Sequence, residues 1–311
     1  MPGTDTPTAA RRETIAVVTV TYSPGEHLEN FLTSIDAAYS GPRPHVVMAD
    51  NGSVDGAPEA ADEAHDEARL LRTGANLGYG GAINYAVAAL RASGEPDPDF
   101  LLISNPDVVF SPGSIDELVD AAGRHPRGGA FGPLIHDPDG TVYPSARNVP
   151  SMRYGVGHAL LGSVWKTNPW TAAYKQSEAD VTERDAGWLS GSCLLVRPAA
   201  FDAIDGFDDR YFMYMEDVDF GDRLARAGWR NVYVPSAEIV HAKGHAAGRV
   251  PELMLPAHHE SAYRFFADRH AGPVAAPLRA AMKVGLAARS RIAVLAALRA
   301  RRAQGGEGGR A

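Results

Sequence analysis

The sequence predicts an α/β protein with a mostly parallel central sheet, helices on both faces of that sheet, and basic amphipathic helices at the C-terminal end. Two observations support the predicted sheet and the helices on its faces. Short apolar runs alternate with segments of helical periodicity, and the connections between them are short. A third observation supports the last part, because eight lysine or arginine residues and no acidic residue lie between Arg269 and Gly306.

Residues 14–110 carry the regular part of the pattern. Apolar runs predict strands there, and segments with apolar residues at helical spacing or with polar helix-forming residues predict helices. The expected strands are 14–22, 45–50, 68–73 and 99–110, and the expected helices are 25–39, 53–68 and 80–93. Ser53 or Asp55 is the expected cap of the second helix.

The pattern becomes less regular from about residue 130. Further strands are expected at 129–135, 187–196 and 237–240, and further helices at 216–227 and from Glu252 onward. Residues 136–186 are rich in Pro, Trp and Tyr without a clear period, which is typical of a functional or mobile segment. Their part 150–186 is a candidate acceptor lid or subunit interface. The termini 1–13 and 304–311 are expected to be disordered.

Composition excludes several classes of protein. Cys193 is the single cysteine, so an intramolecular disulfide and a CxxC-type metal site are excluded and a reducing compartment is expected. The pattern of a signal peptide is missing, and no apolar run approaches the ~20 residues that span a bilayer. The net charge is −8, and an acidic body argues against nucleic acid as the main ligand. We therefore expect a cytoplasmic protein.

Polar side chains follow two of the expected strands at the point where each strand ends. Asp50 and Asn51 close the second strand, Asn105 and Asp107 close the fourth, and a glycine-rich turn lies between them at 76–86. Ordinary turn and capping chemistry is one explanation. A Rossmann dinucleotide site is disfavoured because the turn follows the third strand and lacks the third glycine. Carboxylates that converge on one sheet edge predict instead a divalent metal that carries a diphosphate.

A second acidic cluster directly follows an apolar run. In the stretch YFMYMEDVDF, residues 211–220, Glu216, Asp217 and Asp219 open the expected helix. One explanation is that acids in the first turn complement the helix dipole. The other is that a carboxylate at the mouth of a half-dry site acts as a general base.

The ordered set of these segments resembles the family 2 inverting glycosyltransferases, which have the GT-A fold. The segments are VTVTYSPG, ADNGSVDG, NLGYGGAINYA, ISNPDVVF, WLSGSCLLVRP, GFDDRYFMYMEDVDFGDRL and VHAKGHAAGR. The resemblance covers roughly Thr14 to Arg249. It implies a glycosyltransferase domain at 14–250, in which 14–110 binds the nucleotide sugar and 111–250 binds the acceptor and carries the catalytic groups.

Three segments resemble more closely the actinobacterial family members that rhamnosylate a lipid-linked sugar: GPLIHDPDGTVYPSARNVPS, NPWTAAY and RYFMYMEDVD. This implies dTDP-L-rhamnose as the donor and N-acetylglucosaminyl-diphospho-decaprenol as the acceptor, in assembly of the linker between peptidoglycan and arabinogalactan. The alternatives are another sugar nucleotide, another glycan or a protein as acceptor, or an inactive nucleotide-sugar-binding scaffold. The scaffold alternative rests on Asn105, which replaces the first acid of the family's Asp-x-Asp motif.

The resemblance also implies residue roles. Asp217 is the expected base, with Glu216 beside it, and the expected cofactor is Mn²⁺ or Mg²⁺ on Asp107 and His241, with His245 as the alternative to His241. The expected donor-binding residues are Thr21, Tyr22, Asp50, Asn51, Asn76, Gly78, Asn105, Trp188 and Lys243. For Trp188, stacking on a sugar and packing in the core stay equal alternatives.

The basic C-terminal region places apolar residues at helical spacing over 277–302. Residues 251–303 are therefore expected to form a helical segment that binds an anionic membrane surface, because a polyprenyl-linked acceptor cannot leave the bilayer. The alternative is a helix that packs on the core or on a partner subunit in a homodimer. Membrane binding predicts a peripheral protein on the inner face of the plasma membrane.

Overall fold

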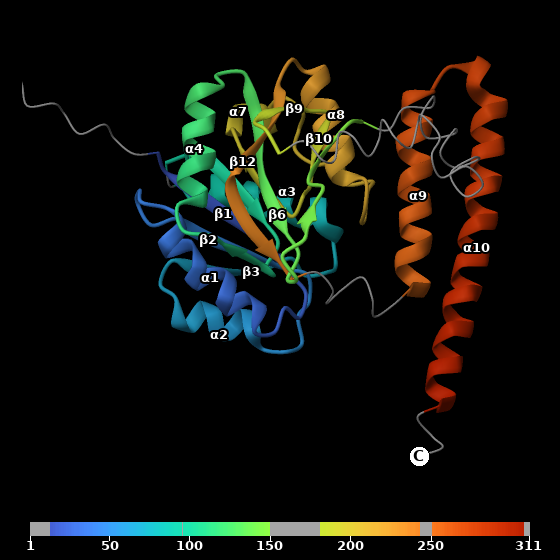
Figure 1. Cartoon of the computed structure of the whole chain (residues 1–311), viewed down its shortest axis with the longest axis horizontal. Coiled ribbons are helices and arrows are strands. Elements are labelled where there is room, and N and C mark those ends of the chain that lie inside the picture. Colours follow the sequence, from blue (N-terminus) through green and yellow to red (C-terminus); the bar gives the residue numbers. More distant parts are fainter. Residues whose placement is uncertain (1–12, 95, 150–180, 243–250, 308–311) are drawn as a thin grey trace, which may run out of the picture.

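A computed structural model describes residues 13–94, 96–149, 181–242 and 251–307. Within them, a ten-stranded mixed sheet has the order β3-β2-β1-β4-β11-β6-β12-β5 (Figure 1). The path consists of β1 (Ile15–Thr21), β2 (His45–Asp50), β3 (Ala68–Arg72), β4 (Phe100–Ser104), β5 (Val108–Phe110), β6 (Gly128–His136), β11 (Cys193–Val196) and β12 (Arg230–His241). Strands β1 to β4 are mutually parallel, and β6 is parallel to β12, so the expected mostly parallel sheet is confirmed.

Four short strands complete the described β-structure. Strand β7 (Val142–Tyr143) pairs with β6 and β9 (Arg184–Ala186) pairs with β12, while β8 (Ala146–Arg147) and β10 (Trp188–Leu189) form a separate two-stranded sheet. All three pairings are antiparallel.

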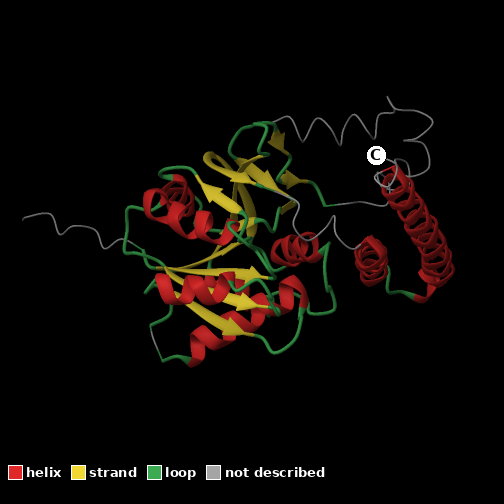
Figure 2. Cartoon of the chain, turned by 90° about the horizontal axis from the view of Figure 1, so that it is seen from below, coloured by secondary structure: helices red, strands yellow, loops and turns green. Residues whose placement is uncertain are grey.

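Helices cover both faces of the sheet (Figure 2). One face packs against α1 (His27–Ala38), α2 (Ala57–Ala64) and α4 (Ser114–Arg124). The other face packs against α3 (Gly78–Ala92), α7 (Pro198–Asp202) and α8 (Glu216–Arg226). Alternating residues of one strand supply the two cores, as Val17 and Val18 of β1 do, because successive side chains point to opposite faces.

Two expected strands are each broken in the structure. The range 99–110 contains β4 and β5, which are separated at Asn105–Pro106, and β5 pairs with β12 at the far edge of the sheet. Proline has no N–H to give to a sheet ladder, which explains the break. The range 187–196 contains β10 and β11, which are separated by a turn at residues 190–192. Both predictions of a single strand were wrong.

The predicted helix at 53–68 is also shorter than expected. Helix α2 begins after Gly56, which has a φ of 77°, and no side chain caps it. Ser53 donates instead to Asp50, and Asp55 accepts from the Gly25 backbone N–H at 2.7 Å. These side chains tie two loops together, and Asp55 also accepts from the N–H of Ala57, the first residue of α2, at 3.2 Å.

The C-terminal helices α9 (Pro251–Arg269) and α10 (Ala276–Glu307) pack on each other beside the α/β body (Figure 1). Helix α9 contacts the body: Ser261 donates to the Met213 carbonyl at 2.9 Å, and Arg269 pairs with Asp222 at 2.7 Å. Phe265 is buried in a cluster with Tyr211 and Trp188. None of the helices in the described ranges is both long enough and apolar enough to cross a bilayer.

Candidate active site

Asp217 lies in the first turn of α8, next to the turn between β10 and β11. Its Oδ2 accepts a hydrogen bond from the Gly191 backbone N–H at 3.1 Å, and its Oδ1 accepts from the Val218 N–H at 2.8 Å. A Cβ on Gly191 would come within 3.3 Å of the Asp217 Cβ. The carboxylate is therefore fixed by backbone donors, and the glycine keeps its approach open.

The chain that leads into α8 has an unfavourable backbone conformation. Tyr214 and Met215 have φ values of 65° and 66°, in the left-handed region that non-glycine residues rarely adopt. Helix α9 holds this loop through two contacts. Ser261 of α9 binds the Met213 carbonyl, and the Tyr214 ring meets the His258 ring edge-on at 5.3 Å. Strain that the surroundings hold in place is common at functional sites.

The glycine-rich turn supports the same loop from the other side. The Tyr79 N–H donates to the Phe212 carbonyl at 3.2 Å, and a Cβ on Gly78 would lie 2.2 Å from that carbonyl oxygen. The Tyr79 hydroxyl donates to the Gly191 carbonyl at 2.5 Å. Burial, followed by the charge of Glu216, raises the Tyr79 pKa well above its ordinary value, so the hydroxyl stays a donor. Tyr79 was not singled out in the sequence, although its place among three glycines was a signal.

Glu216 is half-buried beside Asp217, and its enclosed Oε2 has no hydrogen-bond partner among the described residues. Burial, followed by the charge of Asp217, raises the pKa of Glu216 to about 8. Burial also raises the pKa of Asp217, while the Gly191 N–H and other backbone donors oppose that rise. The pair therefore holds a proton more readily than two isolated carboxyl groups would.

Glu216→Gln is expected to flatten the dependence of stability on pH. The folded protein binds a proton at Glu216 up to about pH 8, whereas the ordinary pKa is 4.5. The contribution of Glu216 to stability is therefore greatest below pH 4.5 and is lost as the pH rises toward 8, because the unfolded chain releases this proton first. Urea unfolding of both proteins across this range measures the effect. A constant difference in unfolding free energy at every pH would contradict it.

Asp107 and His241 meet on the other side of the site. The antiparallel register of β5 on β12 pairs Val108 with His241, which brings the His241 Nε2 to 3.0 Å from the Asp107 Oδ1. The Asn105 Nδ2 lies 3.3 Å from the same nitrogen. Burial raises the pKa of Asp107, but the hydrogen bond and charge of His241 outweigh it and hold that pKa below its ordinary value.

This donor set fits a divalent cation. A carboxylate oxygen and an imidazole nitrogen suit Mn²⁺, and sites of this kind take their other ligands from substrate phosphates and water. The described residues contain no cluster of three or more His, Cys, Asp or Glu side chains that could hold a metal. The described part of the chain therefore supplies few ligands itself. Lys243 and His245, expected at this place, lie outside the described residues.

The other expected donor-binding residues gather at the ends of β1 and β2. The Asp50 carboxylate accepts from the Thr21 hydroxyl at 2.9 Å. Asn51 donates to the Gly78 carbonyl at 3.0 Å, and Asn76 accepts from the Gly78 N–H at 3.1 Å. Hydrogen bonds thus bring five of these residues together, with the exposed Tyr22 next in the chain.

Trp188 is largely enclosed by its neighbours. Only 9% of it is exposed, and its Nε1 donates to the Asn148 carbonyl at 3.1 Å. It packs in the cluster that also contains Tyr211 and Phe265. Most of the Trp188 surface therefore packs in the core, as one of the two alternatives expected. A contact with the donor stays a prediction.

The sequence model of glycosyltransferase-like family 2 matches residues 12–254. The chain belongs to this family. A curated relative in the family comes from Mycobacterium tuberculosis, "N-acetylglucosaminyl-diphospho-decaprenol L-rhamnosyltransferase", and is 56% identical over 92% of this chain and 95% of its own length. The "Rhamnosyltransferase WbbL" of Escherichia coli is 28% identical over 63% of this chain and 73% of its own. The family resemblance expected from the motifs is confirmed.

Solved structures confirm the expected GT-A fold. The mannosyltransferase PcManGT from Pyrobaculum calidifontis, in complex with GDP-Man and Mn²⁺, superimposes with a TM-score of 0.55 at 17% identity. The match covers 98% of this chain and 79% of the mannosyltransferase. At this level of identity the likeness concerns the fold alone.

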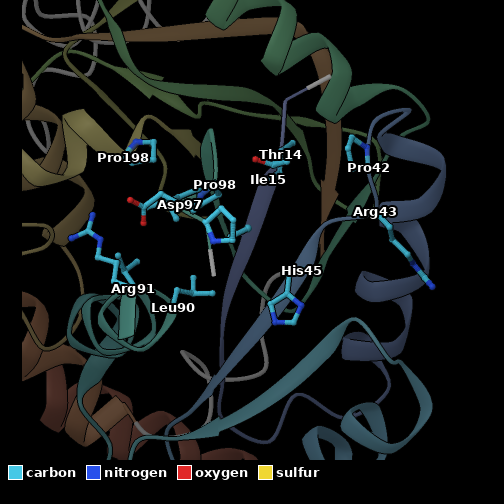
Figure 3. A pocket seen from close by; sticks show the side chains of 14 residues that line it. Thr14, Ile15, Pro42, Arg43, His45, Leu90, Arg91, Asp97, Pro98 and Pro198 are labelled. Atoms are coloured by element: carbon cyan, nitrogen blue, oxygen red, sulfur yellow. The ribbon is translucent and has the colours of Figure 1, made fainter. Parts of the chain in front are cut away.

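This family 2 chain also has a cavity of ≈350 Å³ away from the acid pair (Figure 3). Residues at the starts of β1 and β2, such as Ile15 and His45, line it together with Leu90, Pro98 and Pro198. Ligands of open α/β sheets bind at the opposite, carboxyl ends of the strands. None of the expected site residues lines this cavity, which is mostly apolar, so it is not the active site.

Proposed function

We propose that this protein transfers L-rhamnose, with inversion, from dTDP-L-rhamnose to N-acetylglucosaminyl-diphospho-decaprenol. One observation supports the reaction class: the turn at 190–192 gives the Gly191 N–H to Asp217 and accepts the Asn105 N–H at the Ser192 carbonyl at 2.9 Å, next to the Asp107–His241 pair. The sugar and the acceptor are supported by the name of the Mycobacterium tuberculosis relative. The dTDP part of the donor rests on the motif resemblance.

The proposed mechanism requires few groups. Asp217 accepts the proton of the acceptor hydroxyl while that oxygen attacks the anomeric carbon from the side opposite the diphosphate. The Gly191 N–H keeps the carboxylate in place, and Tyr79 fixes the Gly191 carbonyl on the other face of the turn. Asp107 and His241 would hold Mn²⁺ or Mg²⁺, which supplies charge stabilisation to the leaving diphosphate when bound.

A transfer assay tests the proposal directly. Radiolabelled rhamnose should pass from dTDP-L-rhamnose to lipid-linked N-acetylglucosamine when Mn²⁺ or Mg²⁺ is present, and a chelator should abolish the transfer because the diphosphate then lacks its counter-charge. Transfer from a different sugar nucleotide would favour a sibling enzyme. Nucleotide-sugar binding without transfer to any acceptor would favour a scaffold.

We also propose that α10 binds the inner face of the plasma membrane. The described part of α10 leaves Leu278 and Val284 exposed by 43% and 71%, on a helix that also carries Arg279, Lys283 and Arg289. Each basic residue near an anionic surface adds ~1 kcal/mol of binding free energy. The same exposed apolar residues would also suit a homodimer contact.

Liposome sedimentation distinguishes membrane binding by α10 from a homodimer contact made by α10. The full chain should sediment with anionic liposomes at low salt and much less with neutral ones. A chain truncated after His270, which keeps α9, should lose the sedimentation because it lacks the basic helix. Equal sedimentation of both chains would refute the membrane role. If the full chain does not bind liposomes but is dimeric by light scattering, the exposed apolar residues of α10 would form the homodimer contact instead.

A further inference from the structure

Arg147 has a defined position beside the acid pair. In the two-stranded sheet of β8 and β10, Arg147 is paired with Trp188. Its guanidinium carbon lies 5.7 Å from the centroid of the Trp188 ring and 5.4 Å from that of Tyr143. Its Nε donates to the Pro144 carbonyl at 2.9 Å. Two aromatic rings and one hydrogen bond therefore set the plane of the guanidinium group.

This position adjoins the helix that carries the base. A Cβ on Gly221, one turn beyond Asp217 in α8, would lie 2.8 Å from the Trp188 Cβ, so the Trp188 strand lies directly against α8. The charge of Arg147 is close enough to act on Asp217, whose pKa it lowers against the larger opposing effect of burial. An arginine stays charged at every relevant pH. A cation thus lies beside the base, on the side of α8 that meets Trp188.

The proposed acceptor makes such a cation necessary. Its sugar carries a diphosphate on the anomeric carbon, so the sugar hydroxyl cannot reach Asp217 without bringing phosphate charge near two half-buried acids. Like charges in a water-poor site repel strongly unless a cation lies between them. The Asp107–His241 pair faces the donor diphosphate in the proposed mechanism and does not serve this second one.

We propose that Arg147 binds the diphosphate of the lipid-linked acceptor and so places the acceptor hydroxyl at Asp217. This inference rests on the proposed function, which supplies the acceptor. A guanidinium whose plane is already fixed can bind phosphate oxygens through two parallel hydrogen bonds. A lysine at the same place would keep the charge but lose the stacking and the paired geometry.

Steady-state kinetics with two acceptors test the inference. One acceptor is N-acetylglucosaminyl-diphospho-lipid with a short prenyl chain, and the other is an uncharged alkyl N-acetylglucosaminide. At a pH on the alkaline plateau of the wild-type profile, Arg147→Gln should raise KM for the diphosphate acceptor on the order of tenfold to a hundredfold. KM for dTDP-L-rhamnose and turnover of the uncharged acceptor should match wild type. Arg147→Lys should lie between the two.

Arg91→Gln is the matched control, because Arg91 pairs with Asp202 on the surface far from the acids and its loss removes the same charge. Equal losses of Arg147→Gln with both acceptors would overturn the inference, since they would indicate a structural role or an effect on Asp217 alone. An unchanged KM for the diphosphate acceptor would overturn it as well. Tryptophan fluorescence titration with the diphosphate acceptor separates the two proposals. If the wild type binds this acceptor more tightly than Arg147→Gln does but never glycosylates it, the proposed function fails while the binding role of Arg147 stands.

Discussion

Asp217→Asn is expected to lower the rate of rhamnosyl transfer by about 10²–10⁴-fold while dTDP-L-rhamnose still binds. The asparagine oxygen can still accept the Gly191 N–H, which holds the turn, while the proton acceptor and the hydrogen bond from the Val218 N–H are lost. Radiolabelled transfer measures the rate, and isothermal titration with dTDP-L-rhamnose and Mn²⁺ measures binding.

Asp219→Asn is the control for this change, because it lies on the same helix turn but pairs with Arg223 at 2.6 Å. That variant should lose some stability and keep most of its turnover, since Asp219 is engaged by Arg223 and has no part in the proposed mechanism. A rate for Asp217→Asn within about tenfold of wild type would remove Asp217 as the base, because general bases contribute more than that.

Asp107→Ala is expected to abolish the part of donor binding that depends on the metal. The substitution removes the carboxylate next to His241, and a neutral Asn105 oxygen cannot replace its charge. The dissociation constant of dTDP-L-rhamnose, measured with Mn²⁺ and with a chelator, should differ by at least about tenfold in the wild type and hardly at all in the variant.

Asp97→Ala supplies the control, since it removes an exposed acid at the opposite end of the sheet. This control should keep the full difference between metal and chelator. If Asp107→Ala kept that difference too, the metal would have to bind elsewhere in the protein.

The strands and helices of residues 14–110 could be predicted from the sequence, because buried strands and amphipathic helices differ in the spacing of their apolar residues. Prediction failed at residues 105–107 and 190–192, where an expected strand is broken. These two breaks hold Asp107 and the Gly191 N–H of the candidate site. The apolar runs at these positions predict continuous strands, whereas the observed backbone leaves the sheet and places groups of the candidate site.

Other parts of the site depend on contacts between distant segments, which periodicity cannot report. Tyr79 reaches Gly191 across 112 residues, and Ser261 reaches Met213 across 48. Arg147 meets Trp188 only because β8 and β10 pair in one register. Each residue type is ordinary in isolation, so the sequence indicated a site of carboxylates but not the groups that fix and balance them.

The docking of α9 bears on how this chain could exchange parts with its relatives. The family match ends at residue 254, inside α9, yet Ser261 and Phe265 of that helix contact the strained loop that leads to Asp217. A chimaera joined at that family boundary would therefore replace the support of the proposed catalytic acids along with the tail. A working chimaera is expected to need α9 together with its own loop.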